Sequence, residues 1–393
     1  MSHDAPEVPP GTRWFGAGCS TAGDATHAGK EAAAQAMVGD DAKLLVVSAS
    51  MAHDAGALLQ GIRSVAPQTP LVGMRSGVGL DAAAAEPPSV AVAALGGSGF
   101  SALPVISRNV GGRLREAGAE VARSMAALPA GAAHRALLLL SDGNAGDQQD
   151  VVRGAYRVVG GAVPLAGGSS GDAHMRPAQQ ICGDEVHSDA LVAVALASDA
   201  PIGVGVGHGW QPVGEPLLVT RSAGNHVLEL DGRPALDVYL AHVGASDDVF
   251  TDPETVTDFL LAHPLGLATR YGSEVRVVGG ADHAARALIT MAAIPEGGMA
   301  WFMRGDRASA LQGTHDALGA ALDMLDGRPP VGVLAFDCVG RRRTLADQVD
   351  DSDQALRRLT GAPVATVPTF GEIARVQGMT GFHNHTLVVL ALS

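Results

Sequence analysis

Blocks of hydrophobic and polar positions recur along the chain, and they predict the same series of elements three times. Each series contains an amphipathic helix, a buried apolar strand, a second helix, a strand that begins at a proline, and a final apolar strand. The buried strands, LLVVSAS, ALLLLSDG and VGVLAFDCVG, are apolar on both faces, which is typical of central strands covered by helices. The sequence therefore predicts a mixed α/β fold of layered sheets and helices, built from α-β-α-β-β repeats in two domains.

One predicted strand, GVGVGHGW at residues 203–210, has glycine at every second position. Because side chains alternate across a strand, one of its faces would be bare backbone. An interior glycine costs about 0.5 to 1 kcal/mol relative to alanine, so we expect a closely packed helix or a ligand against that face. His208 and Trp210, on the other face, are candidates for ligand contact, and His208 also for ligation of haem iron. The alternative for His208 is an ordinary core histidine.

The segment between the second and third series has a different pattern. LLVTRSAGNHVLELDGRPALDVYL predicts a strand, a turn at Asp231-Gly232 and a helix. A helix around TVTDFLLAH follows, and then a hairpin of ALITMAAI and MAWFM around PEGG. This change of pattern predicts a domain boundary near residue 232, with one domain at residues 15–232 and a second at 233–393.

Composition and charge exclude several classes of function. The 393 residues include 27 Lys and Arg against 41 Asp and Glu, and the net charge of -14 opposes binding to nucleic acid or to anionic membranes. No apolar run reaches the length of a membrane span, and residues 1–14 do not resemble a signal peptide. We therefore expect a disordered tail at 1–14 and a cytoplasmic protein. The cysteines, Cys19, Cys182 and Cys338, are too widely spaced to indicate a disulfide framework or a structural zinc site.

The loops after the proline-initiated strands align as RSGV at 75–78, SSGD at 169–172 and TFGE at 369–372. A glycine at a strand end leaves backbone N–H groups to meet a ligand, and an adjacent carboxylate can bind an amine. Candidate ligand-binding residues are therefore the two acids and their neighbours: Asp172, Thr369, Gly371 and Glu372. The alternative is that the acids only finish turns or cap helices.

Two residues are candidate nucleophiles. Ser169 lies in GGSSG, which has the G-x-S-x-G pattern of a nucleophile elbow, although the residues after it predict irregular chain and a hairpin in place of the required helix. Cys338 ends an apolar strand, where an inert core thiol is the alternative to a nucleophile. A small-molecule hydrolase or transferase that uses either residue is one interpretation of the chain.

Two further motifs carry polar chemistry. FHNH is predicted to open the last strand, with His383 and His385 on one face and Asn384 on the other. Two imidazoles can bind a metal, but the sequence identifies no third ligand, and hydrogen bonding by His383 or Asn384 is the alternative. CVGRR ends a buried strand with arginines whose fork geometry matches a carboxylate or phosphate, and Arg341 is the first choice for an anionic group.

Several of these motifs, in this order, resemble the FIST family, whose members pair a FIST N-terminal with a FIST C-terminal domain. The resemblance rests on GVGHGWQPVGEPLLVTR with LDGRPALDVYL, on CVGRR, and on PTFGEIARV with FHNHTLVVLAL. It implies a sensory module of intracellular signal transduction that binds a small ligand, with amino acids proposed as ligands. Some bacterial relatives are described as haem-binding nitric oxide sensors, and a eukaryotic relative as an F-box substrate receptor. The family more often has a glutamine-like residue at His385, which weakens a shared metal role.

The sequence thus leads to one main hypothesis, a sensor of a small metabolite such as an amino acid. Arg341 is expected to pair with the ligand's carboxylate and Glu372 with its amine, while His208, His383 and Asn384 supply orienting hydrogen bonds. A haem sensor, an enzyme and a protein-interaction scaffold are the alternatives. No kinase, cyclase or F-box segment is recognised in the chain, so a sensor is expected to act through a separate signalling partner or an oligomeric response.

Overall fold

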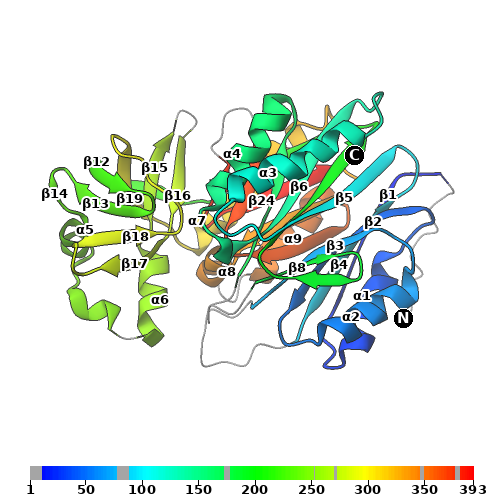
Figure 1. Cartoon of the computed structure of the whole chain (residues 1–393), viewed down its shortest axis with the longest axis horizontal. Helices are drawn as coiled ribbons and strands as arrows, with labels where there is room; N and C mark the ends of the chain where they lie inside the picture. The colour runs from blue at the N-terminus through cyan, green and yellow to red at the C-terminus, as the bar shows by residue number, and fades with distance from the viewer. Residues whose placement is uncertain are drawn as a thin grey trace.

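The computed structural model describes residues 11–77, 88–171, 178–251, 253–269, 272–345, 349–376 and 381–393. It confirms a mixed α/β fold in two parts (Figure 1). We call residues 211–304 the lobe and the other described residues the body. The body contains three sheets, and the lobe has a sheet of its own.

The three body sheets share one order of strands: an edge strand, the last strand of the series, and then two parallel strands. The first sheet is β1 (Trp14–Ser20), β4 (Val90–Gly96), β2 (Ala42–Ser50), β3 (Leu71–Ser76), β8 (Gln179–Cys182) and β9 (Glu185–His187). The second is β5 (Phe100–Arg108), β10 (Ala190–Ser198), β6 (His134–Asp142), β7 (Leu165–Ser170), β22 (Glu372–Arg375) and β23 (Phe382–His383). The third is β11 (Ile202–Gly207), β24 (Leu387–Leu392), β20 (Gly332–Cys338) and β21 (Val364–Thr369).

Two sheets are extended by strands from a later series. The β8–β9 hairpin, which follows β7 in the chain, pairs with β3 of the first sheet, and β22, which follows β21, pairs with β7 of the second. The sheets are therefore joined to one another, because a strand that follows the parallel strands of one series pairs with the outer parallel strand of another.

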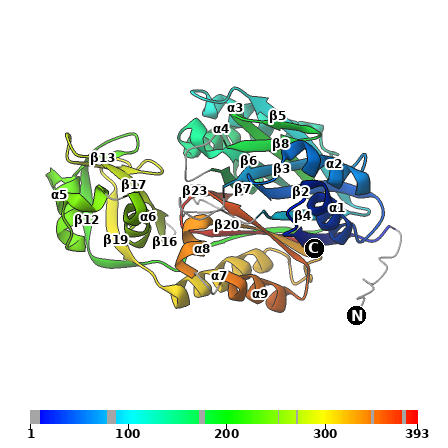
Figure 2. The same ribbon diagram turned by 90° about the horizontal axis from the view of Figure 1, so that it is seen from below.

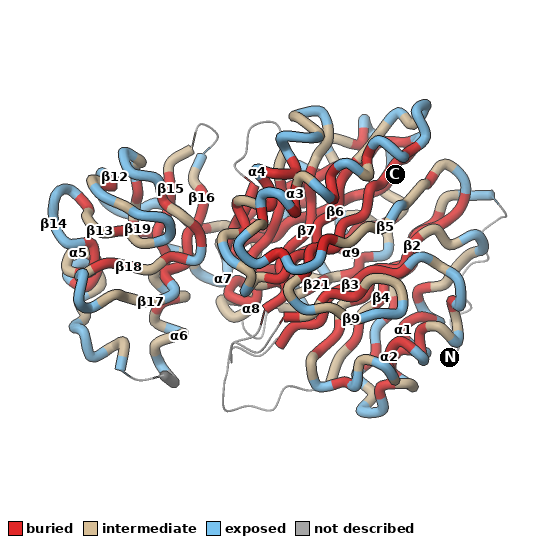
Figure 3. The backbone as a smooth tube through the Cα atoms, in the orientation of Figure 1, coloured by how far each residue is buried: buried red, intermediate tan, exposed pale blue. Residues whose placement is uncertain are grey.

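Helices cover the outer face of each body sheet, and the inner faces of the three sheets share one core. The helices are α1 (Ala25–Ala36), α2 (Ala55–Val65), α3 (Leu114–Ala122), α4 (Gln148–Val159), α7 (Arg307–Asp323), α8 (Val339–Leu345) and α9 (Val349–Thr360). Figure 2 shows α3 and α4 on the opposite side of the body from α7 and α9. The shared core contains Met74, Leu138 and Phe336, one from each sheet, and its strands are the most continuously buried part of the chain (Figure 3).

The glycine-rich strand is β11, the edge strand of the third sheet, and its bare face packs against α7. A methyl group on Gly203, Gly205 or Gly207 would lie 1.9 to 2.1 Å from a carbonyl oxygen of that helix. Of the two expectations for this face, the helix is therefore the correct one. The segment belongs to the third sheet, although its sequence lies outside the predicted third series.

The lobe is an antiparallel sheet with two helices, inserted between β11 and α7. Its strands are β16 (Gly272–Arg276), β15 (Leu265–Thr269), β19 (Met299–Arg304), β12 (Gln211–Ala223), β13 (His226–Leu230), β18 (Ala287–Thr290) and β17 (Val278–Asp282), with β14 (Arg233–Pro234) beside β13; its helices are α5 (Ala235–Val243) and α6 (Pro253–Ala262). The predicted turn is confirmed, since Asp231 and Gly232 have φ of 50° and 71°. Residue 232 thus lies inside the lobe.

The predicted hairpin around PEGG is wrong. β18 pairs with β13 and β17, whereas β19 pairs with β12 and β15. The two strands are neighbours in the sequence, but each joins strands that lie further away along the chain. In the part of the chain that the structure describes, no helix is long and apolar enough to cross a membrane.

Candidate functional site

The three predicted loop tips meet in the body. The amide of Gly77 donates to the carbonyl of Gly171 (3.0 Å), and the amide of Phe370 donates to the carbonyl of Ser169 (2.8 Å). The amide of Ser169 in turn donates to the carbonyl of Gly371 (2.9 Å). The tips therefore bind one another through the backbone groups that the sequence assigned to a ligand. Asp172 lies outside the described residues.

Glu372 begins β22 directly beside these tips and is fully buried. Its carboxyl accepts hydrogen bonds from the Thr369 hydroxyl (2.7 Å) and from the Thr386 amide (3.3 Å). Burial raises the pKa of Glu372 well above its ordinary value, and the negative charge of Asp337 acts in the same direction. Burial therefore favours the neutral form of this carboxyl, which opposes its role as the negative charge that binds an amine.

Arg341 lies in the first turns of α8 and has no exposed surface. Its guanidinium donates to the carboxylate of Asp337 (2.7 Å), to the carbonyl of Ala310 (2.9 Å) and to the hydroxyl of Thr314. These partners lie within the body. They hold α8 to β20 and α7, and they occupy the fork that the sequence assigned to an anionic ligand.

His208 and Trp210 lie where the chain leaves the body for the lobe. The Nδ1 of His208 accepts from the Trp210 amide (2.9 Å), so its Nε2 carries the proton and donates to the Ser273 carbonyl (3.1 Å). Burial lowers the pKa of His208. The Trp210 ring contacts His385, with ring centroids 4.9 Å apart. His208 thus connects the body to β16 of the lobe.

The FHNH motif differs from its prediction. His383 lies in β23 of the second sheet, β24 begins only at Leu387, and His385 has a left-handed backbone (φ 53°). The two histidines therefore do not share one face of the last strand. His383 donates to the Ala374 carbonyl (3.0 Å), and burial lowers its pKa. Burial lowers the pKa of His385 to about 3, and the Leu261 backbone interacts with its ring without ordinary hydrogen-bond geometry.

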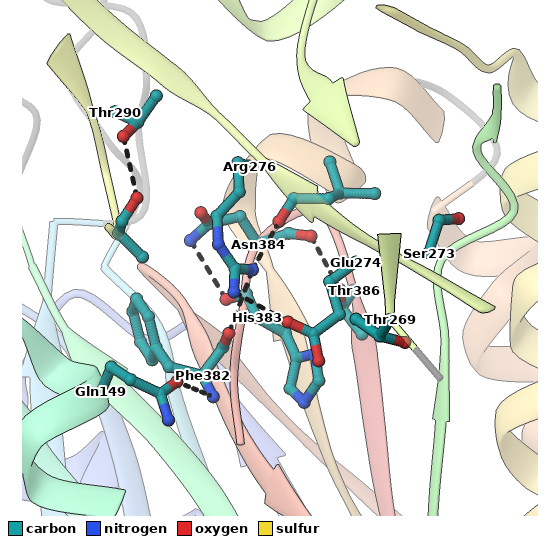
Figure 4. Close-up of polar contacts among 12 residues, drawn as sticks. Gln149, Thr269, Ser273, Glu274, Arg276, Thr290, Phe382, His383, Asn384 and Thr386 are labelled. Atoms are coloured by element: carbon teal, nitrogen blue, oxygen red, sulfur yellow. Dashed lines mark hydrogen bonds and ion pairs between the residues drawn. The ribbon is translucent and has the colours of Figure 1, made fainter. Parts of the chain in front are cut away.

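Asn384 and Arg276 join the body to the lobe (Figure 4). The side-chain Oδ1 of Asn384 accepts from the Val277 amide (3.4 Å), and its Nδ2 donates to the His383 backbone carbonyl (3.0 Å). The Arg276 guanidinium donates to the Glu274 carboxylate (2.7 Å) and to the Phe382 carbonyl (3.3 Å). The sequence prediction missed the pair formed by Glu274 and Arg276. The signal that could have placed them on one face of a strand is their i, i+2 spacing in SEVRVV, where valines occupy the positions that alternate with them.

A cavity of about 170 Å³ lies between the lobe and the body, and we call it the lobe–body cavity. Its described lining residues come from α6 and nearby lobe strands on one side, and from the ends of β20 and β21 and the FHNH segment on the other: Thr257, Leu260, Leu261, Val277, Val278, Gly279, Met291, Cys338, Val339, Gly340, Phe370, Gly371 and Asn384. The cavity thus brings together the predicted residues Gly371, Asn384 and Cys338. Thr369, Glu372 and Arg341 lie close by, because each directly neighbours a lining residue in the sequence: Phe370, Gly371 and Gly340 respectively.

A larger groove, about 490 Å³, lies between the first and third sheets. It is lined by hydroxyl groups such as those of Ser48 and Ser50, and by Arg342, Asp353 and Arg357. None of the sequence-predicted ligand residues that the structure describes lines it. The smaller cavity is the better candidate site because it contains three residues that the sequence singled out and because both parts of the molecule form its wall.

The two candidate nucleophiles are both buried. The Ser169 hydroxyl donates to the carbonyl of Phe370 (2.9 Å), which is a structural bond between loop tips. Burial raises the pKa of the Cys338 thiol far above its ordinary value, and Glu372 adds to the increase. A thiol with a raised pKa is protonated at neutral pH and is a poor nucleophile.

Metal and haem binding find little support in the described geometry. Among the residues that the structure describes, no three His, Cys, Asp or Glu side chains are grouped to hold a metal ion. Both ring nitrogens of His208 have hydrogen bonds, and the lobe–body cavity of about 170 Å³ is smaller than the roughly 300 to 1,000 Å³ of pockets for drug-sized ligands. The cavity is therefore too small for a haem, and the ring nitrogens of His208 are engaged in hydrogen bonds with other groups.

Family models match most of the chain. The FIST N domain model matches residues 43–233 and the FIST C domain model matches residues 235–375. An uncharacterised protein of Mycobacterium tuberculosis (strain ATCC 25618 / H37Rv) is 29% identical over 207 residues, which are 51% of this chain and 53% of that protein. An uncharacterised protein of Mycobacterium bovis is 27% identical over 206 residues, again 51% and 53% of the two chains. The chain thus matches about half the length of these curated relatives.

Solved structures show only distant likeness. Cyanuric acid hydrolase from A. caulinodans has a TM-score of 0.27 and 14% identity, covering 48% of this chain and 71% of that one. PurLQS from Thermotoga maritima has a TM-score of 0.24 and 10% identity, covering 98% and 75%. Likeness at this level says nothing about a ligand or a reaction.

Proposed function

Because the chain belongs to the FIST family, whose domains are in general sensory domains that bind small ligands in signal transduction, we propose that its ligand binds in the lobe–body cavity. The observation that carries this proposal is the origin of the cavity wall. Leu261 and Met291 belong to the lobe, whereas Cys338 and Gly371 belong to the body. A ligand there contacts both parts, so its binding favours the arrangements of lobe and body that close around it.

Lobe orientation is the proposed output of the sensor. The chain crosses between the two parts beside His208 and again at Gly305, and outside these crossings the contacts include the bonds of Arg276 to Phe382 and of Asn384 to Val277. Since the residues of these contacts flank the cavity, a ligand that shifts either side also shifts the lobe. A separate signalling protein would then bind one arrangement in preference to the other.

Amino acids are one ligand class within this proposal, since the sequence predicts that Arg341 and Glu372 hold a carboxylate and an amine. Their described contacts weigh against it. Arg341 is paired with Asp337 inside the body, and Glu372 is buried between Thr369 and Thr386. Both would have to change partners to hold a zwitterion.

The proposal can be tested by thermal unfolding with a metabolite panel that includes the amino acids. The variants are Leu261→Trp, which fills the cavity from α6, and Leu359→Trp, a control at a residue 51% exposed on α9. A ligand present at about 100 times its Kd stabilises the folded protein by about 2.7 kcal/mol. We expect this increase in the unmodified protein and in the control, but not in Leu261→Trp. Equal stabilisation of all three proteins would place the ligand elsewhere, for example in the 490 Å³ groove.

A further inference from the structure

The wall of the lobe–body cavity contains no charged side chain among its described residues. Leu260, Leu261 and Phe370 give it a mainly apolar surface, and the polar side chains are those of Thr257, Cys338 and Asn384. A ligand that enters this cavity exchanges water for apolar contacts over most of its surface.

Two buried ion pairs lie inside the protein next to the lining residues Gly340 and Val277. Arg341 pairs with Asp337 (2.7 Å), and both have at most 1% of their side-chain surface exposed. Arg276 pairs with Glu274 (2.7 Å), and both have at most 4% exposed. The opposite charges within each pair offset one another, and Asp337 also accepts from Arg342 (3.5 Å). A ligand carboxylate or ammonium would therefore lose its hydration without gaining an opposite charge, and such burial is strongly unfavourable.

Asn384 supplies one specific polar contact. Its Oδ1 accepts from the Val277 amide, and one hydrogen of its Nδ2 goes to the His383 carbonyl. A primary amide has two such hydrogens, and the second has no partner among the residues that the structure describes, so it is the hydrogen that a ligand would use. The ligand group that matches it is a hydrogen-bond acceptor, such as a ketone, an ether or a hydroxyl oxygen.

The volume limits the size of the ligand. An apolar cavity of roughly 150 Å³ holds one benzene molecule, and this cavity, which opens to solvent, has a volume of about 170 Å³ for the part of a ligand that it buries. Resting on the proposed function, we infer that the ligand is a small uncharged molecule, about the size of a six-membered ring with one or two substituents. It is apolar over most of its surface and carries one acceptor oxygen that binds Asn384. The inference excludes free amino acids as ligands of this cavity.

Three probes of similar size test the inference on the full chain by ligand-observed NMR titration. Cyclohexanone has the shape and the acceptor, methylcyclohexane has the shape alone, and L-leucine carries both charges. We expect both ring compounds to bind at least tenfold more tightly than leucine, and Asn384→Leu to weaken cyclohexanone several-fold more than methylcyclohexane, because only cyclohexanone carries the acceptor. Tighter binding of leucine overturns the inference, and an equal effect of the variant on the two ring compounds overturns the role of Asn384.

Two variants locate the binding. Met291 lies at the rim of the cavity and is 50% exposed, so Met291→Trp obstructs the opening without disturbing the core. Met299, 36% exposed on β19 and absent from the described lining, provides the control Met299→Trp. Cyclohexanone binding should fall at least tenfold in the first variant and stay unchanged in the second. If no ring compound binds, or if binding ignores Met291→Trp, the inference fails, while the metabolite panel with Leu261→Trp judges the proposed function separately.

Discussion

Glu372 is an acid whose surroundings favour its neutral form. In the folded protein burial holds its pKa well above the ordinary value, whereas the unfolded chain exposes it to water with a pKa of about 4.3. The folded state therefore keeps this proton over a pH range in which the unfolded chain has lost it. The contribution of Glu372 to stability is fully present below pH 4 and decreases as pH rises toward the folded pKa.

Replacing Glu372 with glutamine should remove this pH dependence. Glu372→Gln keeps the shape but cannot ionise, and it loses one acceptor, at a cost of about 1 to 3 kcal/mol. The free energy of unfolding of the unmodified protein should fall relative to the variant between pH 4 and 7, by at most about 1.4 kcal/mol per pH unit. Urea unfolding at several pH values measures the difference. A constant difference across this range would mean that Glu372 is ionised in the folded protein.

Cys338 should react slowly with alkylating agents in the folded protein. Its thiol is 5% exposed and burial raises its pKa, whereas Cys19 is exposed on β1. We expect iodoacetamide at pH 8 to label Cys19 at least about 100-fold faster, because the thiolate is the reactive species. Peptide mass spectrometry gives both rates, and the urea-unfolded protein, in which they should be similar, is the control. Fast labelling of Cys338 would favour the enzymatic interpretation of the chain.

Individual residues of the site could be predicted from the sequence only as far as their chemistry is local. Arg341 follows the end of β20 and Glu372 follows the end of β21, near the convergence of the loops, because the series of elements fixes these positions. Their partners could not be predicted. Asp337 is separated from Arg341 by the change from β20 to α8, and Thr386 reaches Glu372 from the loop before β24 of the third sheet.

At the scale of elements, the sequence predicts helices and buried strands well because their periodicity is local. The turn at Asp231-Gly232 and the helix over TVTDFLLAH both form for this reason. The pairing of β18 and β19 with other strands could not be predicted in the same way, because partners in a sheet are chosen over long distances in the chain. For the same reason the sequence pattern does not assign β11 to the third sheet: its partner in that sheet, β24, lies almost 190 residues further along the chain.

The contact between α7 and β11 predicts opposite effects for two glycine substitutions. In Gly205→Ala the new methyl group would lie 1.9 Å from the Ala317 carbonyl oxygen, which forces α7 away from the sheet. We expect a loss of about 3 kcal/mol, at the upper end for overpacking. A methyl group added at Gly319, within α7, would meet no atom within 4 Å, so Gly319→Ala should stabilise the helix by roughly 0.5 to 1 kcal/mol. Chemical denaturation of both variants measures these changes, and equal effects would contradict the packing argument.

At the scale of the whole molecule, the convergence of the three loop tips is the feature that the sequence predicts best. The similar series of predicted elements favours similar sheets, and the bonds of Gly77 to Gly171 and of Phe370 to Ser169 join their ends. The cavity, however, also needs the lobe, whose sheet has no counterpart in the series. Its apolar wall depends on how α6 and β17 approach the body, and no local pattern contains that information.

The link between the lobe and the body should depend on the buried pair of Arg276 and Glu274. Arg276→Met leaves the Glu274 carboxylate buried without this guanidinium and removes the bond to the Phe382 carbonyl, so we expect a loss of about 3 to 5 kcal/mol in urea unfolding. The double variant Glu274→Gln with Arg276→Met should lose less, because no charge is then left behind.

The exposed pair of Arg221 and Glu229 is the matched control for this experiment. These side chains lie 3.1 Å apart and are 57% and 31% exposed, so Arg221→Met should cost at most about 1 kcal/mol. Hydrogen exchange at β16 and β23 should increase in Arg276→Met but not in the control, because only the first variant removes a bond between lobe and body. Unchanged exchange at both strands would show that other contacts, such as that of His208 with Ser273, hold the lobe in place.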